Sequence, residues 1–282
     1  MPVSGFSVLW LDLREPADRR ARSGALMQAL ARHLEGRDVV RVIDLGCGSG
    51  SNLRATAPAL GPQQTWMLVD NDTALLDSAR ARLCAWAERA EVTPEGVRLI
   101  AQGKDIAVRF VCADLAHDLE SLLSEDDAAD VVTASALFDL CSRAFVERTV
   151  SAIAKRQSAF YTALTFDGSQ TWTPAHPADP RMLDAFSAHQ QTDKGFGVAL
   201  GPKAPAALKD ALEGHGYRVS EASSPWQLGA GDQQLIHALG TGFADAVAET
   251  GWVDRDTLAD WRRLQRTGAT VGHIDTLALP IG

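Results

Sequence analysis

A glycine-rich turn at residues 45–51 carries the clearest chemical signal in the sequence. The preceding residues, 39–43, are rich in Val and Ile, which is typical of a buried strand. This strand ends in a carboxylate, Asp44, and residues 52–60 can form a helix whose first amide groups face a ligand at the turn. Glycines lack a Cβ atom, so a ligand can approach the backbone closely. The turn therefore predicts a nucleotide-type cofactor, held at Gly46, Gly48 and Gly50.

The spacing of the turn narrows the choice of cofactor. Dinucleotide-binding turns follow the pattern G-x-G-x-x-G, whereas here Ser51 stands at the third glycine position. Asp44 would also repel a pyrophosphate, and an acid at this place suits a ligand that carries an amino group and no phosphate. Both features disfavour an NAD-linked oxidoreductase.

The segment 43–50, Ile-Asp-Leu-Gly-Cys-Gly-Ser-Gly, resembles the first motif of the class I S-adenosylmethionine (AdoMet)-dependent methyltransferases. Three further landmarks of that family follow in order: an apolar run that ends in Asp70, a third strand followed by Asp114, and an apolar segment at 130–135. By motif the resemblance covers residues 39–164. It implies an α/β fold, a Rossmann-like doubly wound sheet of seven strands with an antiparallel last strand, helices on both faces and helical additions.

The resemblance implies that AdoMet is the cofactor and S-adenosylhomocysteine the product. It assigns the backbone of the glycine turn and Asp44 to the methionine end, Asp70 to the ribose hydroxyls, and Asp114 with Leu115 to the adenine. Neighbouring side chains are expected to complete the site. The full predicted cofactor-binding set is Asp44, Leu45, Gly46, Cys47, Gly48, Gly50, Asp70, Asn71, Asp114, Leu115 and Ser135.

Methyl transfer from a sulfonium needs no compact catalytic signature, because the leaving group is already activated. The protein mainly positions the acceptor and, if needed, removes its proton. Asp139 follows the fourth strand and is a candidate acceptor-positioning acid or general base; the alternative is a helix cap. His176 and His189 could act as bases near neutral pH, or they are surface or capping histidines.

Loops after the predicted strands offer candidate acceptor contacts. Trp172 and Trp226 could bracket a planar or cationic substrate, or pack a lid. Lys194 could pair with a carboxylate or phosphate, or be solvated. Relatives that methylate amide or adenine nitrogens carry an Asn/Asp-Pro-Pro-aromatic signature where this chain has Ser-Ala-Leu-Phe at 135–138, which weighs against those substrates. The predicted substrate-binding set is Tyr161, Trp172, Asp193, Lys194 and Trp226.

The length of 282 residues fits one α/β domain with additions. We expect a helical cap at residues 1–38, a core at 39–230 with a substrate-side insertion at 167–203, a helical insertion at 231–268, and the last strand at 269–282.

The sequence also predicts where several helices and loops lie. Pro16 is placed in the first turn of a helix, and residues 13–18 either contribute charged groups to the pocket or simply start that helix. The long helix after Asp70 is expected to run to residue 90. Residues 93–103 are expected to be irregular, and residues 167–177 to form a polar loop.

The amino-acid composition bears on whether the protein binds nucleic acid, metal ions or membranes. The net charge of −9 and the pI of about 5.2 disfavour a long nucleic-acid backbone, whose binding depends on phosphate neutralisation. The four cysteines form no C-x-x-C pair and the histidines are scattered, so we expect reduced thiols and no metal site. No apolar run approaches the roughly 20 residues that span a bilayer, and the N-terminus lacks a signal-peptide core.

The sequence thus predicts a cytoplasmic AdoMet-dependent methyltransferase that acts on a small molecule. Two alternatives remain open. An RNA or protein methyltransferase would show a basic or elongated groove beside the methyl group. A catalytically idle methyltransferase-like binding subunit would have its cofactor pocket blocked by side chains.

Overall fold

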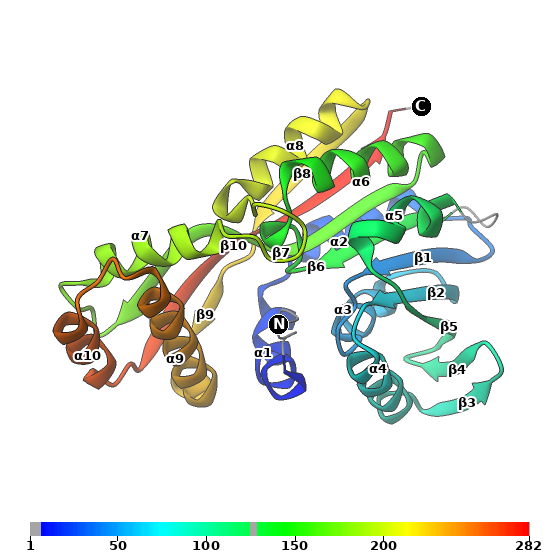
Figure 1. Cartoon of the computed structure of the whole chain (residues 1–282). Coiled ribbons are helices and arrows are strands. Elements are labelled where there is room, and N and C mark those ends of the chain that lie inside the picture. The colour runs from blue at the N-terminus through cyan, green and yellow to red at the C-terminus, as the bar shows by residue number, and fades with distance from the viewer. Residues whose placement is uncertain (1–6, 125–128, 282) are drawn as a thin grey trace.

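The computed structural model describes residues 7–124 and 129–281, which form one mixed sheet with helices on both faces (Figure 1). Residues 1–6 of the predicted cap and the final residue of the predicted last strand lie outside the described residues. The strands are β1 Val40–Leu45, β2 Gln63–Asp70, β3 Arg89–Thr93, β4 Gly96–Ala101, β5 Lys104–Cys112, β6 Val131–Ser135, β7 Ala159–Thr173, β8 Tyr217–Ser223, β9 Trp226–Leu228 and β10 Gly268–Pro280. The helices are α1 Val8–Ala21, α2 Gly24–His33, α3 Ser51–Thr56, α4 Thr73–Trp86, α5 Leu115–Ser124, α6 Arg143–Arg156, α7 Asp179–Gln190, α8 Ala204–Gly214, α9 Gln233–Thr250 and α10 Arg255–Arg263.

The sheet confirms the predicted doubly wound topology. Within the described residues its order is β3-β4-β5-β2-β1-β6-β7-β10-β8, and β9 pairs with β10 outside this path. The strands β5, β2, β1, β6 and β7 are parallel, and β10 lies antiparallel between β7 and β8. These seven strands are the predicted ones, while β3, β4 and β9 bring the sheet to ten.

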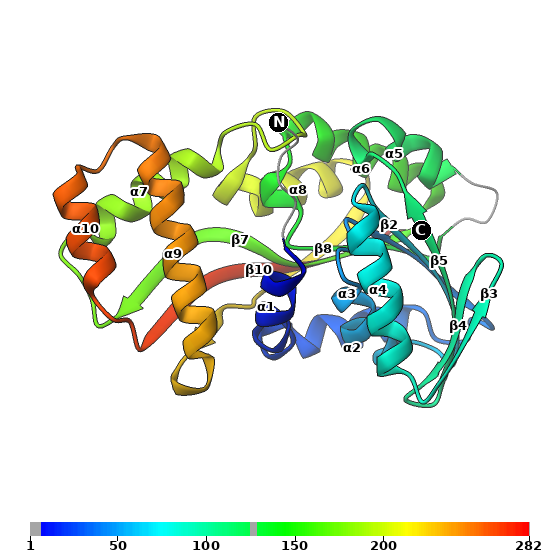
Figure 2. The same cartoon turned by 60° about the horizontal axis from the view of Figure 1, so that its bottom comes forward.

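Two layers of helices bury the central strands, as their continuous apolar sequences require. Figure 2 shows α5, α6 and α8 on one face and α2, α3 and α4 on the other. The first layer buries Leu119, Phe145 and Leu208 against the sheet, and the second buries Leu30 and Leu83. Because β1 is covered on both faces, its carboxyl end and the glycine turn that follows are held in a fixed position.

The prediction that residues 93–103 are irregular is wrong. Strands β3 and β4 form an antiparallel hairpin, and β4 also pairs with β5, so the edge of the sheet is extended. Val97 and Leu99 alternate as buried residues, while Arg98 points outward and forms an ion pair with Asp105. The prediction that the preceding helix runs to residue 90 is also wrong, because α4 ends at Trp86.

The prediction of a polar loop at 167–177 is wrong for residues 167–173. Strand β7 continues to Thr173, because β10 begins at Gly268 and supplies hydrogen-bond partners along this extension. In the extension Gln170 and Trp172 are buried while Thr171 is exposed, which is the alternation of a half-buried strand. The polar side chains therefore reflect an outer sheet face rather than a loop.

The extension of β7 and β10 carries a second group of helices, α7, α9 and α10, at the opposite end of the molecule from the β3–β4 hairpin (Figure 1). A core cluster that includes Met182, Trp226, Phe243 and Trp261 joins these helices to the strands. Helix α1 lies between this group and the glycine turn in both views (Figures 1 and 2).

Helix α1 begins earlier than predicted. Ser7 caps it by accepting a hydrogen bond from the Trp10 amide, so Pro16 lies inside the helix and the expectation of a first-turn proline is wrong. Each of the described helices is too short or too polar to cross a membrane.

We expect Gly96→Ala to destabilise the sheet edge. A Cβ atom at this position would lie 1.9 Å from the backbone carbonyl oxygen of Val108, so β4 would have to shift. The midpoint of urea denaturation should fall by an amount equivalent to about 1–3 kcal/mol. In the control Gly24→Ala, at the start of α2, a Cβ would meet no atom within 4 Å, and the midpoint should change by less than about 0.5 kcal/mol. Equal midpoints for both variants would contradict the pairing of β4 with β5.

Candidate active site

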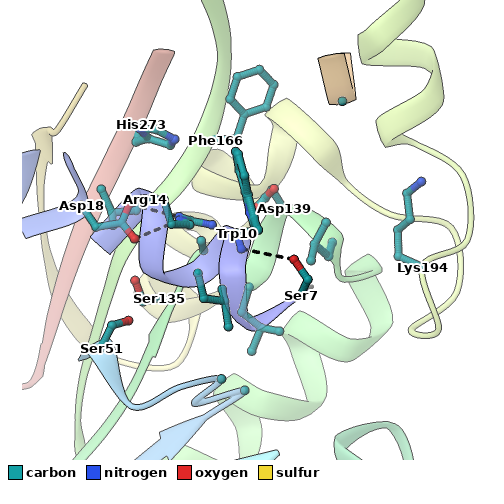
Figure 3. Close-up of a pocket in the computed structure, with 18 of the residues that line it drawn as sticks. Ser7, Trp10, Arg14, Asp18, Ser51, Ser135, Asp139, Phe166, Lys194 and His273 are labelled. Atoms are coloured by element: carbon teal, nitrogen blue, oxygen red, sulfur yellow. Dashed lines mark hydrogen bonds and ion pairs between the residues drawn. The ribbon is translucent and has the colours of Figure 1, made fainter. Parts of the chain in front are cut away.

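A cavity of about 740 Å³ extends from the glycine turn to the second group of helices (Figure 3). Its volume lies within the roughly 300–1,000 Å³ of sites that take small ligands. It opens at the carboxyl ends of β1, β2 and β6, where ligands bind in doubly wound sheets. Helix α1 contributes one wall, and β7, β10, α7 and α9 contribute the far end.

The glycine turn adopts the conformation that its sequence predicts. Gly46, Gly48 and Gly50 have φ angles of 64°, 52° and 77°, a region that favours glycine. The Cys47 amide donates to the carbonyl oxygen of Val69 at 2.9 Å, which fixes the turn against β2. Of the predicted turn residues, Gly46, Cys47 and Gly48 line the cavity, whereas Gly50 packs against α4 and Leu45 is buried below the turn.

Asp44 lies beneath the cavity rather than on its wall. Its Oδ1 accepts a hydrogen bond of 2.7 Å from Asn52 Nδ2, and its Oδ2 is buried without a partner among the described residues. Burial is the main cause that raises the pKa of Asp44 to about 7. Asn52 also accepts from Arg22 at 2.9 Å, and Arg22 donates to Ser135 Oγ at 3.0 Å. Asn52 and Ser135 do line the cavity, so this network connects Asp44 to it.

Asp70 stands at the end of β2 on the cavity wall. Its carboxylate accepts hydrogen bonds from the amides of Gly48, at 2.9 Å, and Asp72, at 3.0 Å. Burial raises the pKa of Asp70, and these two hydrogen bonds oppose the rise. Asn71 lines the cavity next to it, as the sequence predicts. A carboxylate in this position can accept further hydrogen bonds from hydroxyl groups of a ligand.

The structure does not support the role assigned to Asp114. Leu115 and Ala113 line the cavity, but Asp114 does not. Its carboxylate accepts from the Ala116 amide at 2.8 Å and contacts His117 Nδ1 at 2.9 Å, and these contacts, that with His117 first, lower its pKa. The side chain therefore contacts the start of α5 and does not line the cavity.

Asp139 is a buried carboxylate at the far side of the glycine turn. It lies in a single 3-10 turn, 138–140, and its side chain lines the cavity although the residue is only 7% exposed. Oδ1 has no partner among the described residues. Burial raises the pKa of Asp139 to about 6. Backbone hydrogen bonding at Asp139 itself, the guanidinium of Arg14 and backbone hydrogen bonding at Phe166 oppose the rise.

Helix α1 places an ion pair beside Asp139. Arg14 Nε donates to Asp18 at 2.9 Å, and the guanidinium lies 5.1 Å from the ring centroid of Trp226. Trp226 Nε1 donates to the same carboxylate at 2.9 Å, and all three residues line the cavity. Of the two interpretations of residues 13–18, the contribution of charged groups to the pocket is therefore the one that the structure supports.

The remaining predicted acceptor and catalytic residues divide into two groups. His189, Lys194 and Trp226 line the cavity, and His189 Nε2 lies 3.0 Å from Glu249. The structure does not bring the other four to the cavity: Tyr161, Trp172, His176 and Asp193 do not line it.

Each of these four side chains has a local reason for its position. The Tyr161 hydroxyl is buried 3.5 Å from Asp275, and His176 Nε2 lies 3.1 Å from Asp260. Trp172 lies in the β7 extension and packs against Phe243 and Trp261. The carboxylate of Asp193 accepts from amides within its own loop, those of Gly195 and Gly197.

Several cavity residues were not predicted from the sequence. They come from α1, β7, α7, α9 and β10, and no local motif marks them. They are Trp10, Phe166, Gln170, Phe186, Phe243 and His273. Burial lowers the pKa of His273 to about 4, so this side chain is neutral at pH 7. Among residues 7–124 and 129–281, no group of three or more His, Cys, Asp or Glu side chains is placed to hold a metal ion.

Comparison with known proteins identifies the class of fold. The strand order and the glycine turn at the end of the first parallel strand are those expected of the class I AdoMet-dependent methyltransferases. A proposed methyltransferase from Bacillus halodurans matches with a TM-score of 0.52 and 14% identity, over 92% of this chain and 100% of that one. The chain therefore has this methyltransferase fold, as the resemblance implied.

Two further solved structures share the fold. The YcgJ protein from Bacillus subtilis matches with a TM-score of 0.52 and 15% identity, over 92% of this chain and 100% of that one. A cyclopropane-fatty-acyl-phospholipid synthase-like protein from Lactobacillus casei matches with a TM-score of 0.51 and 14% identity, over 96% and 98%. Models of protein families and curated proteins give no match to the sequence.

We expect Asp139→Asn to stabilise the protein at high pH. Because the folded-state pKa of about 6 lies above the ordinary value of 3.8, ionisation of Asp139 costs stability as the pH rises between these values. The free energy of unfolding of the variant, measured by chemical denaturation, should exceed that of the original chain by about 1–3 kcal/mol at pH 8. At pH 4 the two free energies should differ little. Asp184→Asn, which replaces an exposed carboxylate on α7, should show no such pH dependence. A loss of stability at pH 8 would show that the ionised carboxylate is stabilised by its surroundings.

Proposed function

We propose that the chain is an AdoMet-dependent methyltransferase that acts on a small-molecule acceptor. The observation that carries this proposal is one continuous cavity, which joins the glycine turn to a space lined by aromatic side chains and Asp139. A methyltransferase needs these two compartments side by side, because donor and acceptor must meet within one site. The methyltransferase fold supports the same activity.

The residues at the glycine turn fit AdoMet. The backbone of Gly46 and Gly48 is open to the cavity and can approach the methionine end of the ligand. Asp70 can accept hydrogen bonds from the ribose hydroxyls, and Ala113 and Leu115 offer an apolar surface for the adenine. Bound there, AdoMet supplies an electrophilic methyl group on its sulfonium.

The buried acids at this end favour AdoMet over a nucleotide with phosphates. Asp44 is fully buried beneath the turn, and Asp70 faces the cavity. A phosphate would be repelled by both carboxylates, whereas the amino group and the sulfonium of AdoMet carry positive charge. Binding of such a ligand would offset part of the cost of burying these acids.

The enclosure of the cavity supports a small acceptor. Helices α1, α7 and α9 contribute side chains around the far end, so a polymer would have to displace them to reach the site. Among the residues that the structure describes, the cavity is lined by four aspartates, Asp18, Asp70, Asp72 and Asp139, and by one arginine and one lysine, Arg14 and Lys194. This balance disfavours an RNA backbone.

The cavity also bears on the alternative of an idle binding subunit. That alternative expects a cofactor pocket filled by side chains. Leu11 of α1 approaches Gly48, but both residues line an open cavity rather than close it.

We place the protein in the cytoplasm, where AdoMet is made.

The cofactor assignment can be tested by isothermal titration with AdoMet and with S-adenosylhomocysteine. We expect micromolar binding, and at least about ten-fold weaker binding by Asp70→Ala, because hydrogen bonds to a charged group contribute about 1.5–3 kcal/mol. Asp114→Ala should bind within about two-fold of the original chain, because its carboxylate is engaged with Ala116 and His117.

Circular dichroism should show that both variants remain folded, since Asp70 also holds the Gly48 amide. If a folded original chain binds neither ligand, the methyltransferase proposal is wrong. If Asp114→Ala loses binding as Asp70→Ala does, the adenine lies nearer to Asp114 than this arrangement of side chains indicates.

A further inference from the structure

The far half of the cavity has a floor made by the extended strands. Phe166 and Gln170 come from β7, Val271 and His273 from β10, and Trp226 from β9. In the strand register Gln170 and Trp226 lie opposite Val271, and Phe166 lies opposite His273. All five line the cavity, so this floor exists only because β7 and β10 continue beyond the core of the sheet.

The walls of this half are largely apolar. Phe186 of α7 lies with its ring centroid 6.0 Å from that of Phe166 and 4.8 Å from that of Phe243 of α9. Leu239, one helical turn before Phe243, also lines the cavity. A ligand in this half would therefore bury an apolar, ring-shaped body against aromatic side chains.

One carboxylate in this half, Asp139, has no cation in direct contact among the described residues. Arg14 and Asp18 neutralise each other across 2.9 Å, and His273 is neutral. Asp139, nine-tenths buried, has no cationic partner among the described residues, and its Oδ1 lacks any hydrogen-bond donor. The Nε2 atom of Gln170 is likewise buried without a partner. Figure 3 shows Asp139, Phe166, Arg14 and His273 around this space.

We propose that this half of the cavity binds a small, uncharged molecule with an apolar, ring-shaped body and a hydroxyl group, and that the hydroxyl donates its hydrogen bond to Asp139. This inference rests on the proposed methyltransferase function and names its acceptor class. Gln170 donates to a second oxygen where the molecule carries one.

The reaction that follows is O-methylation. A lone pair of the hydroxyl oxygen forms the bond to the methyl carbon, the carbon–sulfur bond of the donor breaks with its electron pair on sulfur, and the hydroxyl proton passes to the Asp139 carboxylate. Asp139 is ionised above pH 6 and can take that proton at neutral pH. No other co-reactant is needed for the atoms and charges to balance.

A hydroxyl group is a better methyl acceptor in this site than an amine, because of their protonation states at neutral pH. A primary amine is an ammonium ion at neutral pH, with a pKa near that of lysine, about 10.4. An ammonium has no lone pair to attack the methyl carbon, and Asp139 is too weak a base to deprotonate it first. A hydroxyl oxygen keeps its lone pairs while its proton is still attached, so attack and proton loss can occur together.

The charge pattern also separates a hydroxyl from a carboxylate acceptor. The ionised Asp139 would repel an acceptor that carries a carboxylate. Lys194 lines the cavity and is the group that would attract it instead. An anionic ligand held by Lys194 is therefore the main competing outcome.

Three probes of similar size distinguish these outcomes: 4-ethylphenol, 2-phenylethylamine and 3-phenylpropanoate. Each is titrated by calorimetry at pH 8 into the full chain saturated with S-adenosylhomocysteine. We expect 4-ethylphenol to bind in the low millimolar range and at least ten-fold more tightly than 3-phenylpropanoate, whose charge the Asp139 carboxylate repels. The ammonium of 2-phenylethylamine can pair with Asp139, so this probe is judged by methyl transfer: with AdoMet in place of S-adenosylhomocysteine, only 4-ethylphenol should be methylated.

Three variants locate the binding. Asp139→Ala should weaken the binding of 4-ethylphenol about ten-fold or more, because the substitution removes a charged hydrogen-bond acceptor. Gly242 lines the cavity on α9, and a Cβ there would meet no atom within 4 Å, so Gly242→Leu should fill the site and abolish probe binding. Ala248→Leu, at an exposed position of the same helix, is the matched control and should change nothing. All three should bind S-adenosylhomocysteine within about two-fold of the original chain.

Tighter binding of the carboxylate, or methylation of the amine in place of 4-ethylphenol, would overturn the proposal. So would binding of 4-ethylphenol that is insensitive to Asp139→Ala and Gly242→Leu, or no binding of any probe by a chain that binds S-adenosylhomocysteine. In each of these cases the proposed methyltransferase function stands. A chain that does not bind S-adenosylhomocysteine contradicts that function as well.

Discussion

The pairing of β10 with β7 over their whole length is the interaction on which the site depends. In the core of the sheet β10 lies between β7 and β8, as the last strand of this fold does. Beyond the core it continues to pair with β7 from Ile274 to Gly268. Both strands thereby reach past the carboxyl ends of the parallel strands and form a platform beside the glycine turn. Helices α7, α9 and α10 bury their apolar faces on this platform, and Trp172, Phe243 and Trp261 pack together there. Without the strand pairing these helices would have no apolar surface to cover, because a helix of this length gains most of its stability from packing.

Helix α1 joins the platform to the core. On the core side its Glu15 forms an ion pair with the buried Arg54 of α3, and its Asp12 pairs with Arg82 of α4. On the platform side Trp10 packs against Trp226, with ring centroids 6.4 Å apart. The helix therefore closes one side of the cavity and presents Arg14 and Asp18 to it from a position that both halves determine. A change in the packing of α1 would alter access to both halves of the cavity.

The sequence predicted the parts of the structure that local patterns encode. The glycine turn, Asp70 at the end of β2 and Asp139 after β6 all follow apolar strands, and strand order in this fold brings those ends together. The β7 extension could not be recognised, because its polar residues form a strand only with the partner that β10 supplies from far along the chain. For the same reason Gln170 and His273 carry no signal of their own. Asp114 illustrates a different limit: its position after β5 was foreseen, but the direction of its side chain is set by His117 and the first amides of α5.

Two buried carboxylates lie near the carboxyl ends of the neighbouring strands β1 and β6: Asp44 on β1 and Asp139 in the turn after β6. Both have raised pKa values. Neither has a cation in direct contact, so each costs free energy in the folded protein without ligands. A fold selected for stability alone would replace them with apolar side chains or pair them with cations. The rest of the molecule contains many such pairs, including the bidentate contacts of Arg98 with Asp105 and of Arg148 with Glu120. Asp139 on the cavity wall and Asp44 beneath it have no such pair. Perturbed acids of this kind are concentrated where a protein binds or transforms a ligand, and this concentration supports the proposal that the cavity beside them is a ligand site.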